Sequence, residues 1–259
     1  MEKSGIIIYG DSMIKFLTVF IRFIIYSLIG YIAECIFVSV ENKKPTNRGF
    51  LCGPICPIYG VGGLLMAFFL KDYKGDYIAL FVLGALLATV IEYITGWALE
   101  KLFHNKWWDY SKNKFNVNGR ICLLNAVLFG IGAIAVVMLG EPLLDKIMAP
   151  LSNFWIVLIG VTLLILFVLD MVYSWIVAFN LRNNIIIVED LKNKKLSDLP
   201  ELLEDALKSK LNKIKKIPKR VSKAFPKFIG DYKAEFDIIN NLKMSNKKKK
   251  SNKDKKKEK

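Results

Sequence analysis

Three carboxyl groups stand inside long apolar stretches of the sequence, where a charge is expensive. They are Glu34, Glu92 and Asp170. A charge held at the centre of a bilayer costs roughly 2.5–3.5 kcal/mol or more, so each carboxyl must face protein, pair with a base or take a proton. Two interpretations stay open for the three acids, a polar lock between helices or part of a substrate, ion or proton pathway. Placement at the membrane surface is a third, and it fits Glu34 best.

The first loop, Asn47–Gly60, reads NRGFLCGPICPIYG and cannot form a straight helix. Pro54 and Pro57 each remove a backbone donor, and the glycines permit close backbone approaches. Broken backbone at membrane depth is tolerated only where it is buried in protein or lines a wet cavity. The loop is therefore either a tight entry into the next apolar segment or a re-entrant rim around a site, with Asn47 and Arg48 as polar heads.

The second loop, His104–Leu124, is rich in aromatic residues and also carries charge. Trp107, Trp108 and Tyr110 have an apolar ring and a polar tip, which suits the membrane–water interface. Asp109 and Arg120 are able to pair with each other or with a charge from the first loop. We expect either an interfacial aromatic anchor or one wall of a polar site.

Motifs of known chemistry are missing from the sequence. It has no GxxxxGK[ST], so the chain is not itself the ATPase of a transporter. It has no GxSxG, HExxH or CxxC, and we predict no catalytic residue, no metal and no cofactor. A zinc cluster of His104 with the cysteines is conceivable, but buried thiols are the simpler interpretation.

Long apolar segments must position these residues. A helix that crosses about 30 Å of hydrocarbon needs about 20 apolar residues, and in lipid every backbone group must be paired within the element. The sequence therefore predicts an all-α, polytopic membrane helix bundle over residues 1–180, with about five transmembrane helices. The segments are roughly Phe16–Val38, Ile55–Leu70, which is short, Tyr77–Leu99, Ile121–Leu139 and Phe154–Phe179.

Lys and Arg in the connecting segments set the expected orientation, because cytoplasmic loops carry the excess. With five spans and the C-terminus inside, 12 of these residues lie inside and 5 outside. In the rival model the second segment re-enters from outside, four helices span, and the counts are 11 and 6. The five-span model is favoured. It predicts a multi-pass protein of the cell membrane with its N-terminus outside, its C-terminus in the cytoplasm and both loops facing the cytoplasm.

Small residues recur within the predicted spans and indicate close helix packing. Gly84 and Ala88 are four apart, and glycines cluster at the start of the second span and within the fourth. Small residues let helices approach closely in lipid. The same faces leave a homo-oligomer possible.

Charge separates the chain into an apolar body and a basic tail. The chain is 53% hydrophobic with a mean hydropathy of +0.34, yet its net charge is +15. Residues 1–180 hold 14 basic and 12 acidic residues, whereas residues 181–259 hold 24 and 11. We expect an amphipathic helical tail over 181–242 that docks on anionic lipid head groups, and a disordered Lys-rich end over 243–259. RNA contact and a purely solvated tail remain alternatives.

Several stretches resemble the ABC-transporter permease family called type IV or CmpB-like. They are YSLIGYIAE, NRGFLCGPICPIYG, EYITGWALEKLF, HNKWWDYS and FNVNGRICL, and together they cover roughly residues 20–140. The resemblance implies a multi-span bacterial membrane protein involved in transport. The matching positions are Glu34, Asn47, Arg48, Gly49, Gly53, Pro54, Pro57, Tyr59, Gly60, Glu92, Glu100, Trp107, Trp108, Asp109, Tyr110, Asn116, Gly119 and Arg120.

Three functions are compatible with these features. The first is a permease subunit that borrows a separate ATP-binding subunit, and it is the one we favour. The second is a membrane enzyme with a polar site at the cytoplasmic face. The third is a scaffold or regulator that acts through the basic tail.

Overall fold

The computed structural model describes residues 2–45, 49–103 and 106–193. Asn47, Arg48, His104 and the predicted tail beyond residue 193 lie outside the described residues. The chain divides into two units, Met1–Ile176 and Val177–Lys259. Of the second unit only the end of the last helix is described. All contacts given below belong to the first unit.

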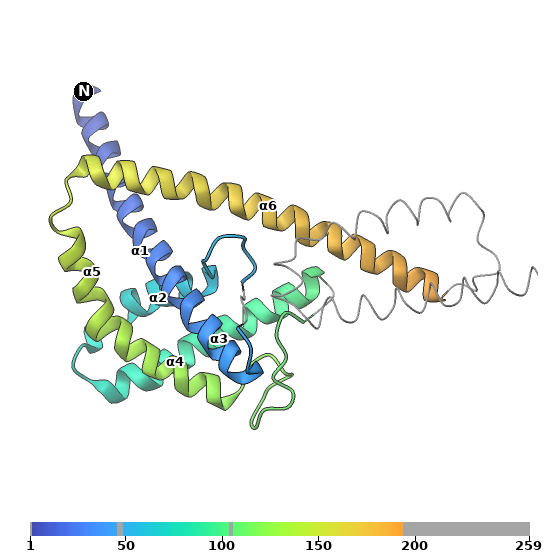
Figure 1. Ribbon diagram of the computed structural model, residues 1–259. Coiled ribbons are helices and arrows are strands. Elements are labelled where there is room, and N and C mark those ends of the chain that lie inside the picture. Colours follow the sequence, from blue (N-terminus) through green and yellow to red (C-terminus); the bar gives the residue numbers. More distant parts are fainter. Residues whose placement is uncertain (1, 46–48, 104–105, 194–259) are drawn as a thin grey trace, which may run out of the picture. The chain divides into compact units, whose positions relative to one another are not determined.

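The described residues form helices joined by loops and contain no strand (Figure 1). This architecture confirms the predicted all-α class. Two of the elements are not α-helices: η1 is a 3₁₀ turn and η2 is a π-helical turn. The elements are α1 (Glu2–Asn42), α2 (Pro57–Phe69), η1 (Lys71–Tyr73), α3 (Tyr77–Phe103), α4 (Leu123–Ala135), η2 (Val136–Gly140), α5 (Glu141–Met148) and α6 (Asn153–Asn193).

Four helical segments are long and apolar enough to cross a membrane, so this is a multi-pass membrane protein. They correspond to the first, third, fourth and fifth predicted spans. The second predicted span forms α2, which has only 13 residues and reaches about 20 Å. The four are Asp11–Val40, Tyr77–Phe103, Leu123–Met148 and Asn153–Phe179.

The directions of the helices place both loops at one end of the bundle. Phe50 of the first loop contacts Phe103 at the end of α3 and Trp175 late in α6, with ring centroids 6.3 and 5.9 Å apart. α1, α3 and α6 therefore run toward this end, which we call the loop end. Asn125 at the start of α4 reaches Glu92 of α3, so α4 runs away from it.

The short helix α2 brings the chain back from the loop end between α1 and α3. The first loop folds back along α1, because the Cys56 N–H donates to the Ser27 carbonyl oxygen at 2.9 Å. Ser27 lies 15 residues before the end of α1, or about 22 Å along the helix. α2 starts at this depth, so its 13 residues and the turn that follows are enough to reach the other end of the bundle. The structure thus agrees with five passes, one of them made by a re-entrant loop and a short helix.

Proline explains the break in the fourth spanning segment. Pro142 has no backbone N–H, and its ring clashes with the carbonyl four residues earlier. The π-helical turn η2 ends two residues before it and widens the helix at that point. The helix then continues to Met148, beyond the predicted end at Leu139, and presents Glu141 and Asp145.

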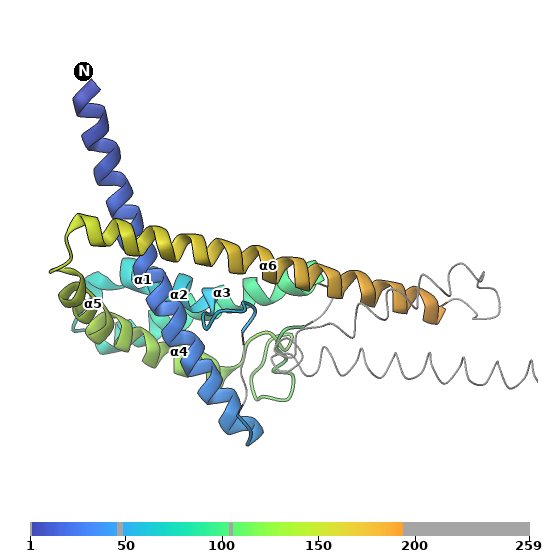
Figure 2. The same cartoon turned by 45° about the horizontal axis from the view of Figure 1, so that its top comes forward.

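The surface of α3, which packs against α4 (Figure 2), is divided between protein and lipid. One row at a spacing of four residues is buried, and a second row two residues away is exposed. Rows of this kind lie on opposite sides of a helix, so one faces α4 and the other faces lipid. The buried row is Leu80, Gly84, Ala88 and Glu92, and the exposed row is Ile78, Val82, Leu86, Val90 and Ile94.

Candidate functional site

The two loops meet in a cluster of aromatic rings. Phe50 of the first loop and Trp107 of the second have centroids 5.2 Å apart in an edge-to-face arrangement. Phe103 and Trp175 complete the cluster from α3 and α6. Aromatic pairs in this geometry are each worth about 0.5–1.5 kcal/mol beyond their burial. The cluster fixes both loops against the helices, so Trp107 packs within protein.

Glu92 lies beneath the loops in the interior of the bundle. Its exposed fraction is 6%. One carboxyl oxygen, Oε1, accepts hydrogen bonds from the Tyr110 hydroxyl and the Asn125 amide, each at 3.2 Å. Tyr110 therefore points from the second loop back into the bundle and binds an acid there. Within the described residues Oε2 is buried and has no hydrogen-bond partner.

Glu34 belongs to the same region and is bound by a second tyrosine. The Tyr59 hydroxyl donates to Glu34 Oε2 at 2.6 Å. Tyr59 occupies the space left by Gly30, where a Cβ would collide with its ring. Glu34 is also close enough to Glu92 to act on it electrostatically. We call Glu34, Tyr59, Glu92, Tyr110 and Asn125 the polar centre.

Asp170 is satisfied in a different way, by backbone amides of the first loop. Its Oδ1 accepts from the Cys52 N–H at 2.8 Å and its Oδ2 from the Gly53 N–H at 2.6 Å. The Ser174 hydroxyl adds a third hydrogen bond at 3.2 Å. Backbone N–H groups stabilise a carboxylate without a counter-charge. Asp170 therefore anchors the re-entrant loop to α6.

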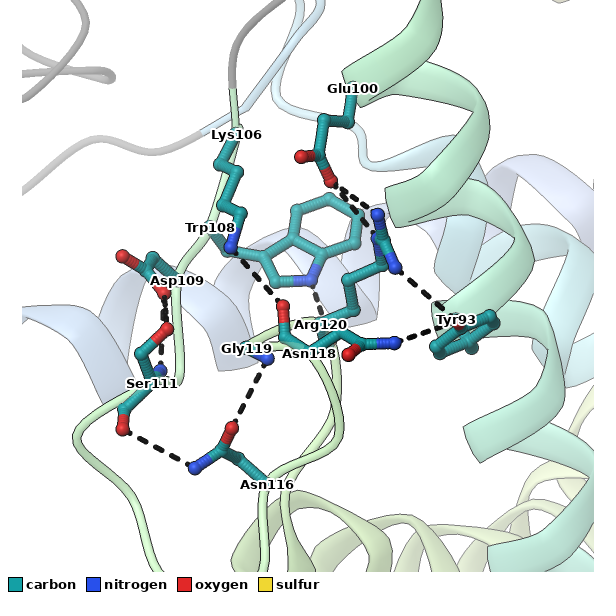
Figure 3. A network of polar contacts seen from close by, with 10 residues as sticks. All are labelled: Tyr93, Glu100, Lys106, Trp108, Asp109, Ser111, Asn116, Asn118, Gly119 and Arg120. Atoms are coloured by element: carbon teal, nitrogen blue, oxygen red, sulfur yellow. Dashed lines mark hydrogen bonds and ion pairs between the residues drawn. The ribbon is translucent and has the colours of Figure 1, made fainter.

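Arg120 and Asp109 both lie in the second loop, but each binds another partner (Figure 3). Arg120 donates to Glu100 Oε2 through Nε at 3.0 Å and through a terminal nitrogen at 2.8 Å. Its guanidinium also lies 5.3 Å from the ring centroid of Tyr93. Asp109 accepts from the backbone and hydroxyl of Ser111. Arg120 thus fixes the end of the loop to α3.

Polar residues hold the second loop in its fold-back shape (Figure 3). The Trp108 indole N–H donates to the Arg120 carbonyl at 2.9 Å, which joins the two arms of the loop. Gly119 sits at the turn with a φ of +70°, a conformation that residues with a Cβ rarely adopt. The Gly119 N–H is bound by the Asn116 side chain. Trp108 therefore has a structural hydrogen bond in addition to any interfacial role.

A second polar cluster lies toward the opposite end of the bundle. Arg22 of α1 pairs with Glu141 and, at 2.5 Å, with Asp145. The Tyr26 hydroxyl also donates to Glu141, at 2.5 Å. Glu141 follows directly after the π-helical turn η2. The cluster gives Arg22 its counter-charges and ties α1 to α5.

The structure brings some of the predicted site residues together and separates others. Glu34 and Glu92 meet in the polar centre, with Tyr110 between the second loop and the bundle. Asp170 and Arg120 act as anchors of the two loops. His104, which the zinc hypothesis requires, lies outside the described residues. The same holds for Asn47 and Arg48, the predicted polar residues of the first loop.

Sequence reasoning missed four partners. Asn125 could have been found as the polar residue in an otherwise apolar fourth span. Tyr59 and Glu100 were among the positions of the family resemblance but had no assigned role. Glu141 lies just beyond the predicted end of its span, so no carboxylate was assigned to Arg22.

Comparison with known proteins gives one finding. A model of the family described as "Putative ABC-transporter type IV" matches residues 21–175. The match covers more than half of the chain and includes both loops and the polar centre. Neither curated proteins nor solved structures gave a match.

Proposed function

Because the chain belongs to the family described as "Putative ABC-transporter type IV", we propose that it is the membrane subunit of a transporter whose ATP-binding subunit is a separate chain. The chain has no phosphate-binding P-loop of its own. Energy from ATP must therefore come from a partner. The substrate pathway in this proposal passes the polar centre.

The single observation that carries the proposal is the polar centre itself. Glu34 and Glu92 are carboxyls within membrane-spanning helices, held by tyrosines from α2 and the second loop. Ionisable groups at this depth are costly, and in membrane proteins they mark substrate and ion pathways. Re-entrant backbone next to such groups is the arrangement found at the binding sites of transporters.

The orientation is part of the proposal. The excess of Lys and Arg on the loop side supports a loop end that faces the cytoplasm, with the N-terminus outside. An ATP-binding partner then meets the two loops. A topology reporter fused before Met1 is expected to be active only outside the membrane. An inward-facing reporter contradicts this orientation.

Co-purification tests the partner. Tagged protein extracted from its own membranes in mild detergent should retain a protein that carries a P-loop, identified by mass spectrometry. Two exposed lysines at opposite ends of the bundle give a matched comparison. Lys112→Glu in the second loop is expected to lower recovery of the ATP-binding subunit several-fold, whereas Lys74→Glu between α2 and α3 leaves it unchanged.

Other results would favour the other two functions. Recovery of no P-loop protein under conditions that preserve the fold contradicts the permease proposal. Lipid-linked material bound near Asp109 would then support an enzyme at the cytoplasmic face. A phenotype that depends only on residues 181–259 would support the scaffold.

A further inference from the structure

Glu92 is not balanced as a carboxylate anion in its surroundings. It is 6% exposed and lies 15 residues after the start of α3 and 11 before its end, about 22 and 16 Å along the helix. It makes no ion pair with any residue that the structure describes. Among the described residues, the titratable group whose charge acts on it is another acid, Glu34. A buried, unpaired carboxylate costs several kcal/mol.

The hydrogen bonds to Oε1 of Glu92 match those of the carbonyl oxygen of a neutral carboxylic acid. Oε1 accepts two hydrogen bonds, from Tyr110 and Asn125, which is the full capacity of a carbonyl oxygen. Both donors are uncharged. Oε2, by contrast, is buried among the described residues without any donor. An anion would need donors at both oxygens. A proton on Oε2 removes the charge and leaves one neutral O–H group without an acceptor among the described residues, which costs less than a buried, unpaired charge.

Asp170 provides the contrast within the same protein. Both of its oxygens accept backbone N–H groups, and Ser174 adds a further donor. This environment suits a carboxylate. The two acids therefore have opposite environments, although both lie in membrane-spanning helices. The two acids differ in the hydrogen-bond donors that surround them.

We propose that Glu92 is a proton-binding site of this protein, with the proton carried on Oε2 and the carbonyl oxygen Oε1 held by Tyr110 and Asn125. Among the described residues, the groups that act on it are Glu34 from α1, Tyr110 from the second loop and Asn125 from α4. Release of this proton leaves a negative charge on a buried carboxyl that receives donors at one oxygen only.

This proposal goes beyond the transport function and does not depend on an ATP-binding partner. Infrared spectroscopy tests it directly, because the C=O stretch of a protonated carboxylic acid is separate from the bands of a carboxylate. Purified full-length protein in lipid nanodiscs at neutral pH is expected to show a protonated-acid band. The band is expected to disappear in Glu92→Gln, which has the shape of the neutral acid.

Two further variants keep the test decisive. Glu100→Gln removes an acid that is already paired with Arg120, and it is expected to leave the band unchanged. Glu92→Asp keeps the acid but alters its distance to Tyr110 and Asn125, so the band is expected to shift in frequency. This result can be read even if Glu92→Gln does not fold. Absence of the band in the wild type overturns the proposal. So does a band that is the same in wild type, Glu92→Gln and Glu92→Asp.

Discussion

Replacing Asp170 by alanine is expected to lower the stability of the protein by on the order of 3 kcal/mol and to release the first loop. The change leaves the N–H groups of Cys52 and Gly53 without their acceptor, and each unmade buried hydrogen bond costs about 1–3 kcal/mol. Asp170→Asn, which keeps one acceptor oxygen, is expected to be intermediate. Thermal unfolding in detergent measures the loss, and a red shift of tryptophan emission reports exposure of Trp107 and Trp175.

The reason for the glycine at position 53 gives a sharper version of this test. A Cβ at Gly53 would lie 2.8 Å from Asp170 Oδ2, so Gly53→Ala must push the carboxylate away from both amides. The double variant Gly53→Ala/Asp170→Ala is expected to lose less stability than the two single variants together, because the collision is gone. Gly49→Ala is the control, since its nearest neighbour lies 3.5 Å away. Simple additivity of the two losses would contradict this account of the loop anchor.

Two pairs of glycines, one in α2 and one in α4, are expected to respond in opposite ways to alanine. A Cβ at Gly60 would collide with Ser27 and the Phe23 ring, and a Cβ at Gly130 would lie 2.8 Å from the Phe81 backbone oxygen. Overpacking of this kind costs typically about 1–3 kcal/mol. Gly60→Ala and Gly130→Ala are therefore expected to lower the melting temperature measurably.

The neighbouring glycines Gly62 and Gly132 serve as controls of identical chemistry. A Cβ at either position meets no atom within 4 Å. Alanine there adds helix propensity of up to about 1 kcal/mol without a collision, so these variants are expected to be neutral or slightly stabilised. Equal losses at all four positions would show that the close helix approaches at Gly60 and Gly130 do not determine stability.

The short second span shows how far hydropathy predicts a membrane fold. The apolar length of Ile55–Leu70 indicated a segment too short for an ordinary span, and two topologies remained open. α2 indeed has only 13 residues. The choice depends on the hydrogen bond from Cys56 to Ser27, which places the start of α2 deep beside α1. A contact between residues 29 positions apart leaves no mark in local hydropathy.

The sequence by itself determined that this is a membrane helix bundle, where its long helices lie, and that Glu34, Glu92 and Asp170 belong to these helices. These properties follow from runs and spacings of neighbouring residues, because lipid imposes its length and its demand for internal hydrogen bonds on each segment separately. Only the tertiary structure decided which donors each acid receives. The backbone donors of Asp170 come from 117 and 118 residues away, and the Asn125 donor of Glu92 comes from 33 residues away. Helix register and the folded-back loops bring these groups together. The same contacts give Asp170 a donor at each oxygen and leave one oxygen of Glu92 without a donor among the described residues.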